Sequence, residues 1–204
     1  MMKLKIFAAL SVALMMAGCA QKQPSAPQKA AENAVETAVV EQAEKAETTD
    51  TVREVTDRLV AIYDEVCKTY NEHFDDDTLS FDDEFNERFL SESYQTLYAQ
   101  MRKESAEYPN ELMGFDFDHW CLGQDWGCLA YDITDVAVNG GLVLAQVDIH
   151  SGEETSTVVL PMVRQDDGEW YIDDFRCFGN YSDRQRMTDC IRECRAEAEA
   201  AVTQ

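Results

Sequence analysis

The densest group of chemically capable side chains in this 204-residue chain lies between positions 116 and 126. Carboxylates, a histidine, an amide and two indoles occur there close together. Carboxylates and amides bind polar ligand groups, and indole rings supply flat apolar walls, so the segment predicts a ligand site at the mouth of a pocket. The alternative is that the indoles fill the core while the carboxylates cap turns. The candidate ligand-binding residues are Asp118, Trp120, Gln124, Asp125 and Trp126.

A pocket carboxylate that acts as general base is a second chemical hypothesis, with Asp125 or Asp173 as the proton acceptor. Asp173 and Asp174 are adjacent in a predicted strand, so only one of them can face inward; the alternative is that both end the strand in solvent. No serine or cysteine near a histidine has a nucleophile-elbow pattern, so the sequence predicts no catalytic triad. The histidines fall in three different predicted elements, at His73, His119 and His150.

Six of the seven cysteines follow residue 50, and an even number in an exported chain predicts disulfides, with fifteen complete pairings. Cys121 and Cys128 flank a glycine-containing loop that could fold back to join them, and Cys177 could bond a cysteine of the last helix. Buried free thiols and a zinc site are the alternatives, but the paired short spacing of zinc sites is missing, so no metal is predicted. The disulfide candidates are Cys67, Cys121, Cys128, Cys177, Cys190 and Cys194.

Acidic side chains outnumber basic ones by 40 to 17, which gives a net charge of −23. This excludes nucleic acid as an expected partner, because phosphate binding needs a basic face, and an acidic face suits a basic protein partner. A small ligand is the other expected partner. The positions 75–77 and 82–84 are all acidic, but a calcium loop would need a glycine at its turn and a closing glutamate. We therefore expect a solvated acidic surface there and no cofactor.

Apolar residues recur at three- and four-residue steps from Val52 to Phe74, which predicts an amphipathic helix. Thr51 and Glu54 predict its start, because these two side chains can cap backbone donors reciprocally. A second helical segment is expected to begin near Ser80, to break at residues 90–91 and to end before residues 109–110. The first half of the domain is therefore expected to be helical.

Four later segments are rich in branched and aromatic residues and tend to alternate, which predicts strands at 129–136, 142–150, 155–165 and 169–176. Residues 139–141 and 166–168 predict tight antiparallel turns, and 150–154 predicts a slightly longer one. Ser182 and Gln185 predict the start of a final helix. One face of that helix carries Met187, Cys190, Ile191, Cys194 and Ala198. The predicted fold class is α+β, with N-terminal helices packed on a curved antiparallel four-stranded meander and a C-terminal helix.

The N-terminus is typical of an export signal: Lys3 and Lys5 precede an apolar run at 6–16 that is too short to span a bilayer. Residues 16–19, Met-Ala-Gly-Cys, resemble the lipobox of bacterial lipoproteins, with Met in place of the usual Leu. The resemblance implies cleavage before Cys19 and acylation of its thiol, with palmitate among the expected acyl chains, which would anchor the protein in a membrane. The alternative is an ordinary secretory signal with a chance cysteine.

The expected organisation is a lipoprotein signal peptide at 1–18, a lipid anchor and flexible tether at 19–50, and a single domain at 51–204. Alanine and glutamate dominate the tether, which has too little apolar bulk to pack. No acidic cluster of the kind that resembles an inner-membrane retention signal follows Cys19 directly. By analogy with lipoprotein sorting, the expected location is the bacterial cell envelope, on the periplasmic face of the outer membrane.

The long first helix, residues 89–91 at the opening of the third helix and the closing segment 167–174 resemble the nuclear-transport-factor-like, or cystatin-like, cone fold. Residues 117–125 are similar to a group of bacterial envelope proteins, often lipoproteins, with an uncharacterised domain of this fold. The resemblance spans about residues 51–178 and implies a curved sheet around helices with a pocket at the open end. Some relatives use this pocket for catalysis and others only for binding, so the fold does not decide the function.

The leading hypothesis is a cell-envelope lipoprotein whose cone domain binds a small ligand or a protein partner without catalysis. The competing hypothesis is a small-molecule enzyme that uses Asp125 or Asp173 as a base. A third is a passive structural spacer.

Overall fold

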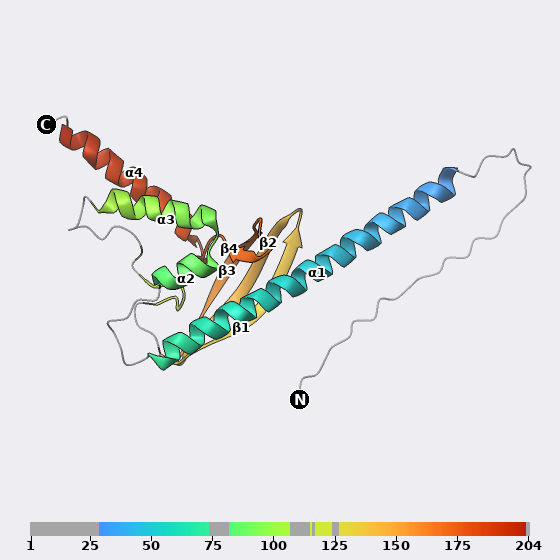
Figure 1. Ribbon diagram of the computed structural model, residues 1–204, viewed down its shortest axis with the longest axis horizontal. Helices are drawn as coiled ribbons and strands as arrows, with labels where there is room; N and C mark the ends of the chain where they lie inside the picture. The colour runs from blue at the N-terminus through green and yellow to red at the C-terminus, as the bar shows by residue number, and fades with distance from the viewer. Residues whose placement is uncertain (1–28, 74–81, 107–114, 116, 124–126, 203–204) are drawn as a thin grey trace, which may run out of the picture. The chain divides into compact units, whose positions relative to one another are not determined.

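The computed structural model describes residues 29–73, 82–106, 115, 117–123 and 127–202. The chain divides into two units at residues 42 and 43. Of the first unit, the described residues 29–42 are helical. Across the described residues there are four helices and one antiparallel sheet of six strands that does not close (Figure 1). The α+β class is therefore confirmed.

Helix α1 spans Lys29–Glu72, so the prediction that it starts at Thr51 was wrong. The preceding segment is rich in Ala, Glu, Gln and Lys, which all have high helix propensity, and the helix continues through the predicted cap. Residues 29–50 of the predicted tether are thus helical, while its earlier residues, the signal and Cys19 lie outside the described part; the domain boundaries stay predictions. The buried face of α1 consists of Val55, Leu59, Ile62, Tyr63, Val66, Cys67 and Tyr70.

Helices α2 (Asp82–Phe89) and α3 (Glu92–Ser105) confirm the predicted break at residues 90–91. Ser91 is the N-cap of α3, and its hydroxyl accepts a hydrogen bond from the Tyr94 amide at 3.0 Å. Its own amide donates to the Ile172 carbonyl at 2.9 Å. This bond fixes the α2–α3 corner against the sheet.

Strands β1 (Leu129–Asn139), β2 (Leu142–Ser151) and β3 (Glu154–Arg164) form two antiparallel hairpins, as predicted. Gly140 and Gly141 both have positive φ, which the first turn requires. The second turn contains only Gly152 and Glu153, so it is tighter than predicted. One face of this sheet is buried through Val143, Ala145, Val147, Ile149, Val158, Leu160 and Met162.

The fourth predicted strand is divided into β4 (Trp170–Ile172) and β5 (Arg176–Cys177), which both pair with β3. The interruption at residues 173–175 places Asp174 and Phe175 in the interior, where they are 2% and 0% exposed. A short strand β6 (Tyr181–Ser182) then pairs with β5. A single regular strand could not direct these two consecutive side chains inward, because its side chains alternate.

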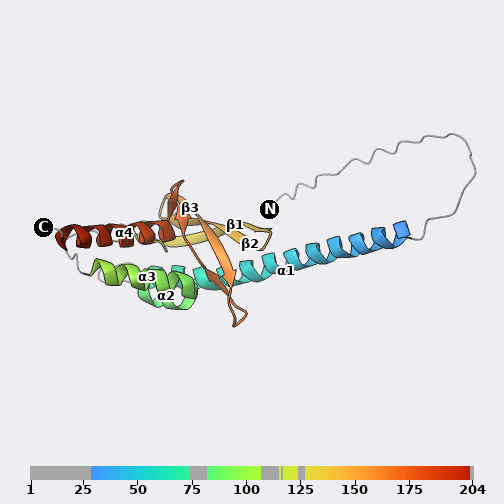
Figure 2. The same ribbon diagram turned by 90° about the horizontal axis from the view of Figure 1, so that it is seen from above.

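Helix α4 (Asp183–Val202) begins where predicted, and the Ser182 hydroxyl accepts a hydrogen bond from the Gln185 amide at 3.2 Å. Its buried apolar residues are Met187, Cys190, Ile191 and Cys194, whereas Ala198 is exposed. Helices α3 and α4 lie side by side in both views (Figures 1 and 2), and a 2.7 Å ion pair links Arg195 to Glu104. The C-terminal helix thus packs back on the domain.

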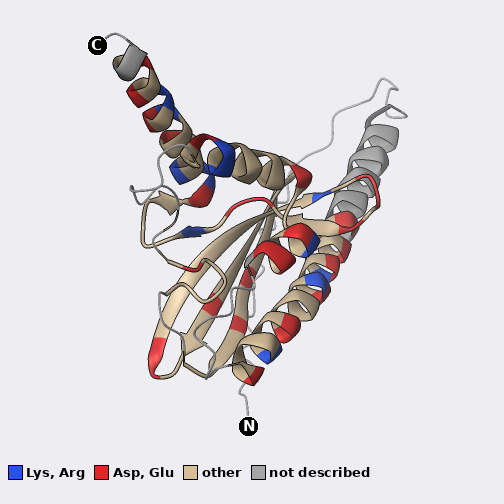
Figure 3. Ribbon diagram, turned by 60° about the vertical axis from the view of Figure 1, so that its left-hand side comes forward, with Lys and Arg blue, Asp and Glu red and all other residues tan. Residues whose placement is uncertain are grey.

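Acidic side chains are spread over the strands and all four helices, with fewer basic ones between them (Figure 3). The sheet face opposite the core carries Asp132, Asp148 and His150. His150 contacts Asp132 at 3.1 Å and Thr155 at 2.9 Å. The acidic residues of the sequence therefore form an acidic surface.

Candidate functional site

A group of buried polar side chains connects helices α2, α3 and α4. His119 is 2% exposed, and Asp183, at the start of α4, is fully buried. The two side chains are 3.2 Å apart between Nδ1 and Oδ2. The other ring nitrogen of His119 lies 3.0 Å from Oδ1 of Asn86 on α2, and Tyr94 of α3 donates to Asp183 Oδ2 at 2.7 Å. One imidazole therefore joins elements that are far apart in the sequence.

The orientation of the Asn86 amide follows from Trp120. The indole Nε1 lies 3.1 Å from the amide, and because an indole nitrogen can only donate, the facing atom must be the oxygen of Asn86. His119 Nε2 must then also donate to this oxygen, while its Nδ1 faces a carboxylate. One proton therefore lies between Nδ1 and Oδ2, and we interpret His119 and Asp183 as a buried imidazolium–carboxylate ion pair.

Burial around this ion pair keeps the neighbouring acids protonated. Burial raises the pKa of the Tyr94 hydroxyl well above its usual value, and the charge of Asp183 raises it further. Burial also raises the pKa of the Cys177 thiol to about 12, with added contributions from the charges of Asp183 and Asp174. Both groups stay neutral at pH 7, so Tyr94 remains a hydrogen-bond donor to the carboxylate.

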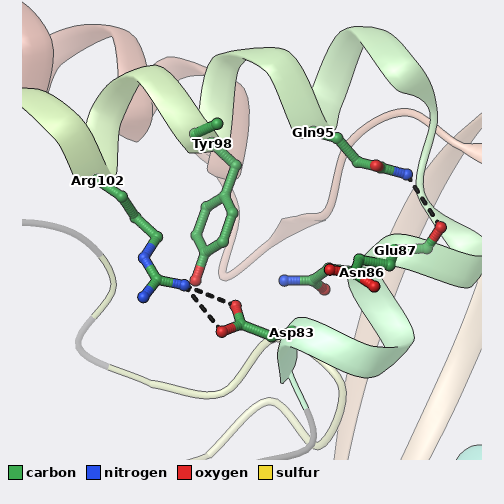
Figure 4. Close-up of a pocket in the computed structure, with 7 residues that line it drawn as sticks. Asp83, Asn86, Glu87, Gln95, Tyr98 and Arg102 are labelled. Atoms are coloured by element: carbon green, nitrogen blue, oxygen red, sulfur yellow. Dashed lines mark hydrogen bonds and ion pairs between the residues drawn. The ribbon is translucent and has the colours of Figure 1, made fainter.

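The Asn86 amide nitrogen points toward a cavity of about 400 Å³ between α2 and α3 (Figure 4). Asn86 is 3% exposed, and its Nδ2 has no hydrogen-bond partner among the described residues. The oxygen of the same amide accepts from both Trp120 and His119, so rotation of the amide would lose two hydrogen bonds. The lining residues are Asp83, Asn86, Glu87, Gln95, Tyr98, Ala99 and Arg102.

The rim of this cavity is polar. Arg102 Nη1 contacts both carboxylate oxygens of Asp83, at 2.8 and 2.9 Å, and both side chains are more than half exposed. Gln95 Nε2 donates to the Leu90 carbonyl at 2.8 Å. On the apolar side, the Tyr98 ring stacks nearly parallel on Phe115 with ring centroids 6.1 Å apart. The cavity therefore combines hydrogen-bonding groups with one fixed aromatic wall.

The predicted ligand loop supplies structural contacts in its described part. Trp120 is fully buried. The Asp118 carboxylate accepts a 2.7 Å hydrogen bond from the Trp120 amide and a further one from the Tyr70 hydroxyl. These contacts match the alternative to a ligand site, in which the Trp120 indole fills the core and the Asp118 carboxylate stabilises a turn. The remaining candidates Gln124, Asp125 and Trp126 lie outside the described residues.

The two aspartates at the break after β4 have different surroundings. Asp174 accepts hydrogen bonds from the Ser182 hydroxyl at 2.8 Å and the Arg184 amide at 3.0 Å, so the expectation that both end a strand in solvent was wrong for Asp174. Asp173 accepts from the Ser91 hydroxyl at 2.5 Å and from Arg184 at 3.0 Å. Asp173, the second candidate base, thus forms an ion pair with α4 and a hydrogen bond with the N-cap of α3.

In the structure the six candidate disulfide cysteines are thiols, and five of them are buried. Burial raises the pKa of Cys67 to about 11, with further contributions from Asp64 and Cys128. Burial also raises the pKa of Cys190 to about 11, followed by contributions from Cys194. The structure thus brings Cys67 near the exposed Cys128 and Cys190 beside Cys194. The existence and pairing of disulfides stay predictions.

The other candidate polar groups do not converge. His73 follows the end of α1 and His150 is on β2, so neither shares an element with His119. No group of acidic, histidine and cysteine side chains among the described residues could hold a metal ion. Residues 75–77 of the acidic segment lie outside the described part. None of the described helices is both long enough and apolar enough to span a bilayer.

Comparisons of the chain with protein-family models, curated proteins and solved structures find no match. The site must therefore be interpreted from its own residues. Sequence reasoning missed Asn86, Tyr94 and Asp183, which are the partners of His119. The one available signal was position: Asn86 follows Phe85 and precedes Phe89 by three residues, which places it beside the buried face of α2.

Proposed function

We propose that this chain is a lipid-anchored protein of the bacterial envelope whose α+β domain binds a small ligand, without catalysis, in the cavity between α2 and α3. The observation that carries the proposal is the Nδ2 of Asn86, which is buried, points into that cavity and has no hydrogen-bond partner among the described residues. Leaving a buried amide donor without a partner costs about 1–3 kcal/mol. Native structures seldom keep such a group unless a ligand or water satisfies it.

The cavity has the size and rigidity expected of a ligand site. Its volume of about 400 Å³ falls within the range of roughly 300–1,000 Å³ typical of small-molecule pockets. Two hydrogen bonds hold the Asn86 amide, and a stacked ring holds Tyr98, so neither group must be ordered when a ligand binds. Such preorganisation lowers the entropic cost of binding.

The envelope location is proposed from residues 16–19, whose sequence resembles a lipobox. The cone fold is likewise a proposal, supported by the long helix α1 and by three long antiparallel strands connected as consecutive hairpins. In that interpretation, β4 and β5 together correspond to the fourth strand of a curved meander, interrupted at Asp173 and Asp174.

Filling the cavity tests the binding proposal. Ala99 is an exposed lining residue of α3, and its neighbour Gln100 is exposed but does not line the cavity. The full-length chain, Ala99→Trp and the matched control Gln100→Trp would be purified in lipid nanodiscs from bacterial envelopes and compared by native mass spectrometry. We expect a co-purified small molecule with the original chain and with Gln100→Trp, but not with Ala99→Trp.

Screening a library of small polar compounds against the same three proteins covers the case of a ligand lost during purification. If no compound discriminates Ala99→Trp from Gln100→Trp, the cavity is not a ligand site and the proposal fails. The anchor is tested separately: Cys19→Ser should abolish incorporation of a labelled fatty acid, and undiminished labelling would refute the lipidation at this residue.

A further inference from the structure

The hydrogen-bonding groups of the α2–α3 cavity restrict the chemistry of its ligand. Asn86 Nδ2 is a donor, so the ligand must offer an acceptor at this point. Asp83 and Glu87 offer carboxylate acceptors at the rim, so the ligand gains most if it also carries donors there. A hydroxyl group both donates and accepts, and a ligand with several neighbouring hydroxyls meets both requirements.

The charges of the lining argue against strongly charged ligands. The lining residues carry two carboxylates, on Asp83 and Glu87, and one guanidinium, on Arg102, so their formal net charge is −1. An anion would be repelled by this surplus. A compact cation offers only donors, which cannot satisfy the Asn86 donor and are repelled by Arg102.

The apolar side of the cavity suits a ring with an apolar face. Tyr98 and Ala99 lie on consecutive positions of α3. The stack of Tyr98 on Phe115 fixes its ring as a wall. A volume of about 400 Å³ is at the small end of ligand pockets, which leaves room for about one or two sugar rings.

We infer that the α2–α3 cavity binds a neutral polyhydroxylated ligand, a mono- or disaccharide unit, with Asn86 Nδ2 donating to one hydroxyl oxygen and Glu87 accepting from another. This inference rests on the proposed binding function and specifies its ligand class. Nδ2 is screened from solvent, so the ligand reaches it when a rim side chain moves. The Asp83–Arg102 ion pair is suited to this movement, because both side chains are exposed and such surface pairs contribute little to stability.

Three probes share one ring and differ in charge, so they distinguish the effect of charge from that of shape. They are glucose, which is neutral, glucuronate, which is an anion, and glucosamine, which is a cation. Each would be titrated into the ¹⁵N-labelled full-length chain in lipid nanodiscs, with the side-chain amide signal of Asn86 followed by NMR. We expect glucose to shift this signal and to bind at least about fivefold more tightly than either charged probe. Equal or tighter binding of glucuronate or glucosamine would overturn the assignment to a neutral ligand.

A matched pair of variants tests the contact with Glu87. Both Glu84 and Glu87 are exposed on α2, but only Glu87 lines the cavity. A hydrogen bond to a charged group is worth about 1.5–3 kcal/mol, so Glu87→Leu should weaken glucose binding at least about tenfold, whereas Glu84→Leu should leave it within about twofold. Equal effects of the two substitutions would refute the assigned contact.

The outcomes also separate this inference from the proposed function. If no sugar shifts the Asn86 signal but another small compound does, and Ala99→Trp blocks that compound, the saccharide assignment is wrong and the binding function stands. If neither sugars nor library compounds shift the signal, both proposals are wrong.

Discussion

Neutralising Asp183 should strongly destabilise the domain. Asp183 is fully buried, lies 3.2 Å from the His119 ring and accepts a 2.7 Å hydrogen bond from Tyr94. The substitution Asp183→Asn keeps the shape of the side chain but removes its charge. It would leave the imidazolium of His119 in the core without a counterion. Burying an unpaired charge carries a large desolvation free energy.

The expected cost is about 3–5 kcal/mol, the usual effect of removing one partner of a buried ion pair. Domains of this size are stable by only about 5–15 kcal/mol, so the variant should be marginally folded. His119 can relieve part of the penalty by releasing its Nδ1 proton. The variant should therefore contain a neutral imidazole that still donates from Nε2 to Asn86 Oδ1, the contact that measures 3.0 Å in the structure.

Urea unfolding followed by tryptophan fluorescence measures this cost, because the Trp120 ring lies 5.5 Å from the His119 ring in the core. The control is Glu193→Gln on the same helix, which breaks an exposed 3.4 Å pair with Arg186 and should cost at most about 1 kcal/mol. Imidazole ¹⁵N shifts would report the protonation of His119 in both proteins. Equal costs for the two substitutions, or a neutral His119 in the original chain, would refute the buried ion pair.

Further predictions concern the helix–sheet contact, the thiols and the surface charge. Asn71→Ala removes two hydrogen bonds between its side chain and the Leu129 backbone, at 2.6 and 2.8 Å, and should cost about 1–3 kcal/mol in urea unfolding; no measurable change would contradict the contact. In the reduced protein, stability contributed by the Cys177 thiol is complete below the unfolded pKa of about 8.5 and is lost as pH rises toward about 12. Iodoacetamide at pH 8 should accordingly modify the exposed Cys128 well before Cys177, and equal rates by mass spectrometry would contradict this order. Any basic protein partner should bind faster at low salt, and an association rate independent of ionic strength would assign the acidic surface to solubility alone.

Local patterns predicted those parts of the fold that depend on neighbouring residues. The break at residues 90–91 and the start of α4 were predicted because Ser91 and Ser182 cap their own helices. The hairpin at residues 139–141 was predicted because glycines tolerate positive φ. These features need no knowledge of distant contacts.

The remaining features depend on contacts between distant segments. The strand break after Ile172 places Asp174 where backbone and side-chain donors of the next segment satisfy it. The sequence places Asn86 beside the apolar face of α2, but its burial depends on His119 and Trp120, which are more than 30 residues away. A pattern of apolar residues cannot reveal a polar residue that is buried because distant partners satisfy it.

The buried ion pair and the cavity are best understood as one arrangement. A buried ion pair contributes little net stability, so stability alone does not explain why His119 and Asp183 share the core. The pair does fix a protonated Nε2, which together with the Trp120 indole turns the Asn86 oxygen inward. Only then does the amide nitrogen face the cavity as a fixed donor. The ion pair thus helps to preorganise Asn86 Nδ2 for the proposed ligand, which is a role beyond stability.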